Sequence, residues 1–523
     1  MWLEVVYPSL AVRQEGFVEI PREVGSLYVC PGMDRITSIK ELVDSEYGQA
    51  VEIDAKNQAV YFGRDYLGQH PLIYAQTSDK LFISDEHSEV VAWLASNDVK
   101  PDLSEESLAL FFTMGYVPQG VSLYEQIVPC ENASLYRWEK GRVFRDDLFV
   151  PVDEDPNAKL GELADCIESE MERYCAGLDD VDVWCSGGLD SSVIAACANV
   201  SGRRADVLTL IYDDSVRSIV GDGELPFAEE AASHCGSPLR LVELSPELYR
   251  DVFQQHCKGH ISPTIDLCVL PKYALASATR HLALTGEGAD PLFAGTKNNT
   301  MLFAHAQHPN TSLGWLYAMS HQRSGRMLDK ILKRGDELEG YVADYFSKLF
   351  ERYPGSLLRK LFYINTFVKL GGMIFCENYY AAKRFNVKAR HPLAARSVYE
   401  TAFRLSDEKK YVFPKGKLAL IDIYRKMLPT SIVERPKSGT RIPLAMYLEC
   451  ITPGVSGLES LQDSGLFNEG IYDRLKHPVT GLRSDVLLNY GLATLEGWLA
   501  CNNMRIAAGT DTEIPQERIV TGT

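Results

Sequence analysis

A glycine- and serine-rich segment holds the residues whose types and spacing could do chemistry. It follows the apolar run 181–185, and a helical stretch is expected soon after it, at 193–200. Glycines let the backbone approach an anion closely, and the start of a helix presents unpaired N–H groups at the positive end of its dipole. The pattern predicts a phosphate-binding loop made of Ser186, Gly187, Gly188, Leu189, Asp190, Ser191 and Ser192.

An acidic residue in that loop indicates a metal ion. Asp190 would repel a phosphate, so its carboxylate makes chemical sense as a ligand of Mg²⁺ that bridges phosphates. A second carboxylate, Asp290, follows another glycine-rich segment and could complete the Mg²⁺ site. No lysine follows the first loop, which distinguishes it from a P-loop. The other residues that we assign to nucleotide binding are Leu210, Gly286, Glu287 and Gly288.

These residues need a scaffold that brings both loops to the same edge of a β-sheet. From residue 159 onward, short apolar runs alternate with helical stretches, which predicts a parallel, doubly wound α/β sheet with its ligand site at the carboxyl ends of the strands. The expected strands are 181–185, 206–212, 239–242 and 281–285, and the expected helices are 160–174, 193–200 and 229–234. The segment 300–507 is expected to be mostly helical, and 508–523 to be a flexible tail.

The segment 1–150 has a different pattern. Short alternating or apolar runs at 59–62, 71–74 and 80–84 predict strands, and Ser104 is suited to cap a helix that ends at residue 114. A proline- and acid-rich stretch near residue 150 has no periodicity and is the expected linker. The sequence therefore predicts an N-terminal domain at 1–150 and a second domain at 159–507.

Composition narrows the class of protein. The 523 residues include 53 Lys and Arg against 71 Asp and Glu, and the net charge of −18 argues against binding to nucleic acid or anionic membranes. No apolar run reaches the roughly 18 residues that span a bilayer, and the first residues do not resemble a secretory signal. The 12 cysteines form no CxxC pair. We expect a cytoplasmic protein with reduced, buried thiols.

Together these motifs resemble the asparagine synthetase family over nearly the whole chain. In the first domain the similar segments are 63–72, 81–86 and 115–118, and in the second they are the two glycine loops, 387–393 and 434–443. Members of this family adenylate a carboxylate with ATP, and an amine then displaces AMP to give an amide. The resemblance implies an α+β, Ntn-hydrolase-like sandwich followed by an α/β synthetase domain with a helical C-terminal part. It also implies ATP and Mg²⁺ as cofactors.

Two departures from the family pattern bear on function. The family's glutaminase uses an N-terminal cysteine as its nucleophile, but here position 2 is Trp2 and the first cysteine is Cys30. Since the family's Asn-Gly-Glu loop is also missing, we interpret this domain as a degenerate glutaminase without that activity. The second departure is Lys388, at a position where asparagine synthetases carry Glu. A reversed charge inside a buried pocket argues against aspartate-plus-ammonia chemistry.

The candidates for catalysis are Lys388, Glu377, Tyr380 and Lys437. Glu377 and the neighbouring tyrosines, Tyr379 and Tyr380, could supply an acid or a base. Lys437 lies in a segment that resembles the family's late lysine loop, where a cation would neutralise charge on the α-phosphate and the acyl oxygen. Lys417 resembles a further family lysine.

Loss of the ammonia supply, with the adenylation loops kept, points to an amine that is already present on the substrate. Lasso-peptide cyclases of the family join a peptide's N-terminal amine to an internal Asp or Glu side chain, and we expect such a macrolactam synthetase of natural-product biosynthesis. Its partners would be a peptide that carries both groups and a leader-binding protein or protease. The alternatives are a β-lactam synthetase or other small-molecule amide synthetase, an ammonia-dependent asparagine synthetase, a GMP-synthetase-like enzyme and a nucleotide-binding scaffold without activity.

Overall fold

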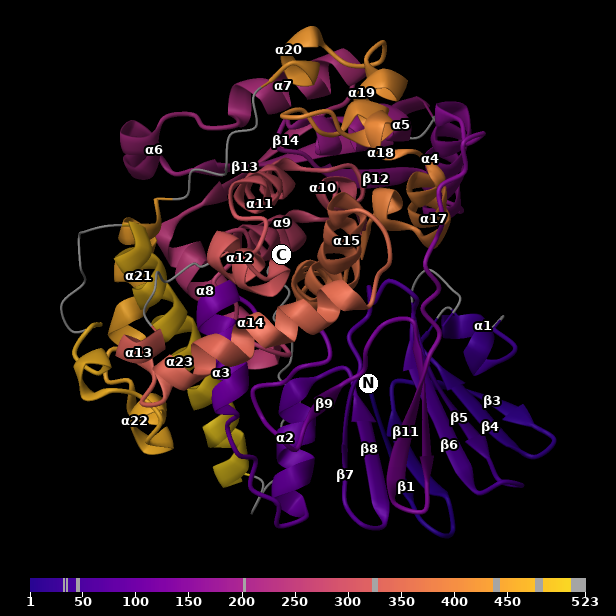
Figure 1. Ribbon diagram of the computed structural model, residues 1–523, viewed down its shortest axis with the longest axis vertical. Helices are drawn as coiled ribbons and strands as arrows, with labels where there is room; N and C mark the ends of the chain where they lie inside the picture. The colour runs from indigo at the N-terminus through magenta and orange to yellow at the C-terminus, as the bar shows by residue number, and fades with distance from the viewer. Residues whose placement is uncertain are drawn as a thin grey trace, which may run out of the picture.

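The computed structural model describes residues 1–31, 33, 36–43, 48–200, 204–321, 328–435, 443–475 and 483–508. Two antiparallel sheets lie in the first part of the chain, and a parallel sheet lies at the other end of the molecule, with helices between them (Figure 1). The described part of the chain contains no helix that is both long enough and apolar enough to cross a membrane.

The N-terminal sheets pack face to face. One has the order β2-β1-β8-β7-β9 and the other the order β11-β10-β6-β5-β4-β3. Their strands are β1 (Trp2–Val6), β2 (Ala11–Glu15), β3 (Val18–Arg22), β4 (Gly25–Val29), β5 (Gln49–Asp54), β6 (Ala59–Arg64), β7 (Ile73–Gln76), β8 (Lys80–Ser84), β9 (Val128–Pro129), β10 (Ser134–Glu139) and β11 (Arg142–Asp147). Alternating side chains such as Leu3 and Val5 of one sheet share a buried core with Val51 and Phe62 of the other. The strands predicted at 59–62, 71–74 and 80–84 all lie in this sandwich.

The third sheet is parallel throughout, as predicted. Its order is β14 (Leu239–Leu244), β13 (Arg204–Tyr212), β12 (Asp180–Trp184), β15 (Leu282–Thr285) and β16 (Lys388–Arg390). The first four match the predicted strands. The fifth was not predicted, because three residues with two charges among them show no apolar run, and the strand forms only through its pairing with β15.

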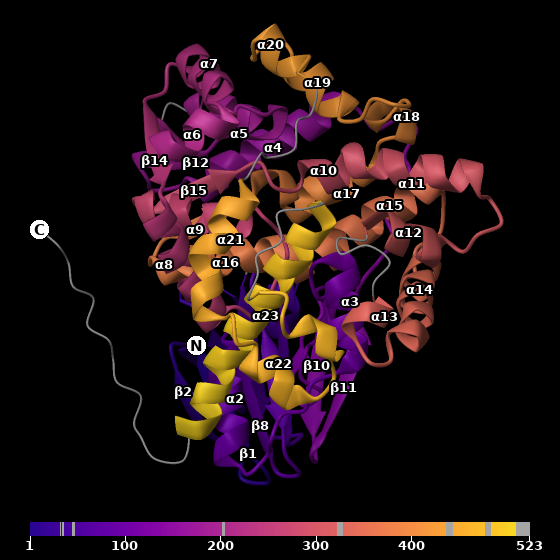
Figure 2. The same cartoon turned by 90° about the vertical axis from the view of Figure 1, so that its left-hand side faces the viewer.

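Helices cover both faces of the parallel sheet. On one face lie α5 (Leu189–Val200) and α7 (Leu225–Cys235), and on the other lies α9 (Val269–Ala278), with α8 (Pro246–Gly259) beside it (Figures 1 and 2). This arrangement is the predicted doubly wound layer structure.

The other helices are mostly in the C-terminal half, as expected for 300–507. They are α1 (Ile39–Val43), α2 (His87–Ser96), α3 (Glu105–Met114), α4 (Leu160–Tyr174), α6 (Asp214–Val220), α10 (Ala289–Leu292), α11 (Thr296–Gln307), α12 (Leu313–His321), α13 (Leu328–Ile331), α14 (Gly335–Glu351), α15 (Leu357–Tyr363), η1 (Ile364–Ile374), α16 (Phe375–Arg384), η2 (Pro392–Ala394), α17 (Arg396–Arg404), α18 (Asp407–Lys410), α19 (Leu418–Tyr424), α20 (Thr430–Val433), α21 (Leu444–Ile451), η3 (Thr452–Gly454), α22 (Glu459–Ser464), η4 (Glu469–Ile471) and α23 (Arg483–Ala508). Ser104 caps α3 as predicted, because its hydroxyl accepts a hydrogen bond from the Ser107 N–H at 3.2 Å.

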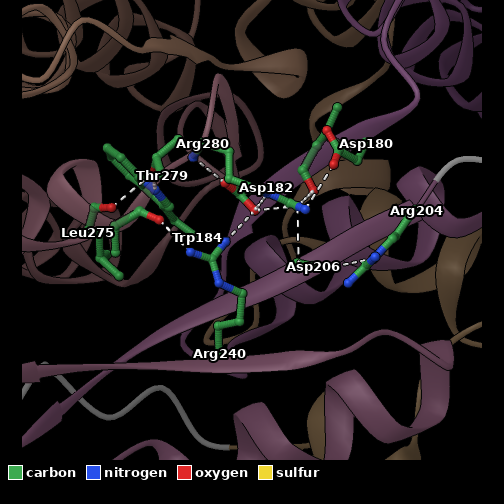
Figure 3. Close-up of polar contacts among 11 residues, drawn as sticks. Asp180, Asp182, Trp184, Arg204, Asp206, Arg240, Leu275, Thr279 and Arg280 are labelled. Carbon is green, nitrogen blue, oxygen red and sulfur yellow. Dashed lines mark hydrogen bonds and ion pairs between the residues drawn. The ribbon is translucent and has the colours of Figure 1, made fainter. Parts of the chain in front are cut away.

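Buried charges fasten the amino ends of the parallel strands. Asp182 of β12 and Asp206 of β13 are neighbours in register, and both are buried. The Arg280 guanidinium lies 2.7 Å from Asp182 and 3.4 Å from Asp206, and Arg240 of β14 adds a contact of 3.0 Å to Asp182 (Figure 3). Since adjacent buried carboxylates repel, these arginines make the pairing of β12 with β13 possible.

The N-terminal sandwich is docked onto one continuous helical run, α15–η1–α16. The segment η1 is wound as a π-helix. The Arg64 guanidinium donates to the Gly371 carbonyl at 3.4 Å, and the Asn132 amide donates to the Phe367 carbonyl at 3.4 Å. Side chains of the sandwich thus bind carbonyl groups of the π-helix.

Candidate functional site

A cavity of about 790 Å³ lies at the carboxyl ends of β12, β13 and β15. This is the edge of the sheet at which a ligand site was predicted. Among the predicted nucleotide-binding residues, those on the cavity wall are Ser186, Gly188, Asp190, Ser191, Leu210, Gly286 and Glu287. Both glycine-rich loops therefore contribute to one cavity, although about a hundred residues separate them in sequence.

The loop after β12 is held in shape by its own residues. Gly187 has φ of +66°, and a Cβ there would lie 2.3 Å from the Phe227 carbonyl carbon, so only glycine fits. The Ser191 hydroxyl accepts from the Ser186 N–H at 3.3 Å and donates to the Gly188 carbonyl at 3.2 Å. Helix α5 begins at Leu189, four residues before the predicted start, so its first turn lies beside the loop.

Four of the predicted nucleotide-binding residues, Gly187 among them, are not on the cavity wall. Ser192 is fully buried, with its hydroxyl 4.0 Å from the Cys185 sulfur, and Leu189 packs against the core. Gly288 precedes α10 with φ of +102°, and its missing Cβ leaves room for Ala394. Together with Gly187, these residues shape the loops rather than line the cavity.

The two predicted metal ligands, Asp190 and Asp290, both form ion pairs with the same lysine, Lys417. The Lys417 ammonium lies 2.5 Å from Asp190 Oδ2 and 2.5 Å from Asp290 Oδ1. Burial alone would lower the pKa of Lys417, but the carboxylates of Asp190 and Asp290 raise it above its ordinary value. The lysine is therefore a charged group held between two carboxylates.

This donor set fits Mg²⁺. The ion prefers oxygen ligands and is commonly held by one or two carboxylates together with substrate phosphates. The described residues contain no group of three or more His, Cys, Asp and Glu side chains that could hold a metal ion. Phosphate and water oxygens would therefore have to complete the coordination by Asp190 and Asp290.

A buried ion pair lies behind another part of the cavity wall. Glu377 is fully buried, and its Oε2 lies 2.8 Å from the Lys272 ammonium, while Oε1 accepts a hydrogen bond from the Thr264 hydroxyl at 3.2 Å. Burial raises the pKa of Glu377 to about 7, although Lys272 opposes the shift. Lys272 itself lines the cavity and lies 3.5 Å from Glu287 Oε1. Glu377 therefore acts on the cavity only through Lys272.

Lys272 was not among the site residues predicted from the sequence. A signal was present, because Lys272 is the only charged residue in the mostly apolar helix α9. A charged residue on such a helix is usually buried only when it has a charged partner, which makes Lys272 a candidate site residue. Its partner, Glu377, is 105 residues away in sequence, and only the tertiary structure reveals the pair.

Two candidates for catalysis lie outside this cavity. The Tyr380 hydroxyl donates to the Asp85 carbonyl at 2.6 Å, so this tyrosine joins α16 to the N-terminal sandwich. Lys388 is exposed at the first residue of β16 and pairs in register with Leu282, at the amino end of the sheet. The expectation that Lys388 is buried is therefore wrong, because on the short edge strand β16 it is exposed, although it is one of the residues that line a smaller cavity. Lys437 lies outside the described residues, as does the tail from residue 509.

A second cavity, of about 340 Å³, lies between the sandwich and α16. Its wall includes Cys30, His70, Asp85 and Lys388. Burial raises the pKa of the Cys30 thiol to about 11, so this cysteine is not present as a thiolate at neutral pH. The wall also includes His391, whose Nδ1 lies 2.7 Å from the Thr285 hydroxyl on the wall of the larger cavity.

Comparisons with known proteins agree with this architecture. Residues 169–476 match the family model for asparagine synthase, and residues 47–147 match a glutamine amidotransferase domain. A glutamine-hydrolyzing asparagine synthetase 1 of Bacillus subtilis (strain 168) is 22% identical over 434 residues, which cover 75% of this chain and 67% of that protein. A putative glutamine-hydrolyzing asparagine synthetase of Mycobacterium bovis is 20% identical over 444 residues, covering 76% of this chain and 66% of the relative. The chain thus spans about two thirds of the length of these relatives.

Proposed function

The chain belongs to the asparagine synthase family, and from this premise we propose that it is an ATP-dependent carbon–nitrogen ligase. It adenylates a substrate carboxylate with release of pyrophosphate, and an amine then displaces AMP to form an amide. The observation that carries this proposal is the convergence of Asp190, Asp290 and Lys417 beside the loop that follows β12. A strand-to-helix loop with backbone N–H groups and two carboxylates suits a nucleotide triphosphate and its metal.

In the first step, a carboxylate oxygen of the substrate bonds to the α-phosphorus, and the bond from that phosphorus to the bridging oxygen breaks. The N–H groups at the start of α5 receive the departing pyrophosphate, with the Ser186 hydroxyl as an additional donor. Asp190 and Asp290 would hold Mg²⁺, whose charge neutralises the phosphates when it is bound. The fixed ammonium of Lys272 adds a positive charge to the cavity wall.

In the second step, an amine bonds to the acyl carbon, and the bond from that carbon to the AMP oxygen breaks. The amine loses a proton in this step, and we assign its acceptance to Glu287, one of the carboxylates on the cavity wall. Lys272, 3.5 Å away, holds Glu287 in place. Glu377 in turn holds Lys272, so it acts as a positioning residue.

We further propose that the amine belongs to the same substrate and that the product is a macrolactam of a peptide. Support comes from the N-terminal sandwich, where Trp2 stacks on Phe82 at the start of β1 and the thiol of Cys30 is held protonated. Neither residue offers a nucleophile for glutamine hydrolysis. Without released ammonia, one molecule that carries both reacting groups gains a large effective concentration. A leader-binding protein or protease is the partner that this proposal implies.

A second candidate is asparagine formation, which the names of the relatives favour. ATP–pyrophosphate exchange separates the two. We expect exchange with a peptide that has an internal Asp or Glu, and no release of ammonia from glutamine. Exchange with free aspartate, followed by asparagine formation, would instead support the second candidate. Exchange with a small N-substituted amino acid would support a β-lactam-type synthetase.

The variant Asp190→Asn tests the site itself. Loss of one carboxylate weakens the hold on the metal and on the phosphates, so exchange should fall at least about a hundredfold. The matched control is Asp344→Asn, an exposed aspartate on α14, which should exchange as the wild type does. Full exchange by Asp190→Asn would exclude the proposed metal site.

A further inference from the structure

One ammonium group occupies the space between the two carboxylates that suit a metal ion. Lys417 Nζ lies at the same distance, 2.5 Å, from Asp190 Oδ2 and from Asp290 Oδ1. These carboxylates come from the first turns of two different helices, α5 after β12 and α10 after β15. Like charges brought so close need a cation between them, and the lysine supplies it.

The backbone that carries this lysine is firmly placed. Lys417 has φ of +59°, and its N–H donates to the Phe293 carbonyl at 2.6 Å. The preceding Gly416 has no room for a side chain, because a Cβ there would lie 1.7 Å from the Ala294 carbonyl oxygen. The turn at residues 416–417 is therefore packed against the turn that follows Asp290. Because the backbone is held in place, only the four-carbon side chain of Lys417 can change its position.

We propose that Lys417 is an internal counterion that a divalent cation displaces from Asp190 and Asp290. Mg²⁺ binds carboxylate oxygens at about 2.0–2.1 Å, so the ion and the ammonium cannot share the same two oxygens without strong repulsion. Metal entry therefore expels the ammonium from the carboxylates. The released side chain then carries its charge into the cavity, where it can meet a phosphate group.

This exchange of cations has two consequences. The carboxylates stay paired whether or not the metal is present, so the two loops keep their spacing. The metal also arrives at a site where the ammonium already neutralises one of the two negative charges, so its net affinity is lower than two free carboxylates would give. The inference concerns metal binding, and it holds for any carboxylate substrate.

Removal of the lysine charge tests the proposal directly. The protein is titrated with Mn²⁺ in the absence of nucleotide, and free Mn²⁺ is measured by electron paramagnetic resonance. Lys417→Met should bind Mn²⁺ at least about tenfold more tightly than the wild type, because the metal no longer competes with the ammonium. Lys415→Met, which removes an exposed charge two residues away, should match the wild type. Equal or weaker binding by Lys417→Met would overturn the proposal, and so would the absence of Mn²⁺ binding in every variant.

A measurement on the wild type covers the case in which Lys417→Met fails to fold. Lysines are labelled with an amine-reactive reagent, and the extent of labelling is read by mass spectrometry. Saturating Mn²⁺ should increase the labelling of Lys417 at least about threefold, because an ammonium held by carboxylates reacts slowly. Labelling of Lys415 should not change. Unchanged labelling of Lys417 would refute the displacement. Failure of the proposed amide synthesis would appear separately, as absent ATP–pyrophosphate exchange.

Discussion

The Lys272 ammonium lies 2.8 Å from Glu377 and 3.5 Å from Glu287, which makes it the centre of a small charged group on the cavity wall. Burial disfavours a charge on Glu377, and the pKa of about 7 follows from it. At a pH below that value, Glu377 takes up a proton and loosens its hold on Lys272. We therefore expect the position of Lys272 to change as the pH falls through about 7.

Substitution of Glu377 by Gln should remove this dependence. In the wild type the rate of ATP–pyrophosphate exchange should rise as pH increases through about 7, because only ionised Glu377 holds Lys272 firmly. In Glu377→Gln the rate at pH 8 should fall about tenfold, and the rise near pH 7 should disappear. Glu351→Gln, an exposed site on α14, serves as the control. A variant that keeps the wild-type pH profile would rule out a positioning role.

At the scale of elements, the sequence predicted the strands, helix ends and loops that are determined by residues close together in the chain. The apolar runs of β12 and β13, the cap of α3 and the two glycine loops could all be recognised from neighbouring residues. The strand β16 could not be predicted, because it depends on pairing with β15, and Lys388 was misplaced for the same reason. The start of α5 was predicted late, since two glycines ahead of it hide the first helical turn. Lys272 and Lys417 became interpretable only when their carboxylate partners were known.

Gly187→Ala tests the loop that joins β12 to α5. A residue with a side chain is strained at φ of +66°, and the new methyl group would meet the backbone of Phe227 and Ala228 at the start of α7. We expect a loss of about 1–3 kcal/mol in the free energy of unfolding and a weaker affinity for ATP. Urea unfolding and calorimetric titration measure the two effects. Gly161→Ala, in open space on α4, is the control. An unchanged ATP affinity would show that the loop tolerates displacement.

At the scale of the whole molecule, histidines buried between the domains and helices make stability sensitive to acid. Burial lowers the pKa of His87 to about 3 and that of His256 to about 3, so both stay neutral in the folded protein. In the unfolded chain each has its ordinary pKa, near 6.5, and takes up a proton as the pH falls below that value. Each histidine therefore lowers the free energy of unfolding as pH falls from about 6.5 toward 3.

His256→Gln measures this contribution. Because the variant cannot take up that proton, its unfolding free energy should fall less steeply, by about 1.4 kcal/mol per pH unit, between pH 6 and pH 4. Urea unfolding at several pH values gives the slopes. His308→Gln removes an exposed histidine and should leave the slope as it is in the wild type. Parallel slopes for wild type and His256→Gln would contradict the burial argument.

The helix α16 also has an evolutionary consequence. Glu377, near its start, forms an ion pair with Lys272 on the cavity wall. Tyr380, one turn later, donates a hydrogen bond to the backbone of the N-terminal sandwich. A deletion of the sandwich would remove the support of this helix and so disturb Lys272 as well. Selection on the synthetase can therefore preserve the whole sandwich in the gene, even in lineages where the sandwich performs no reaction of its own.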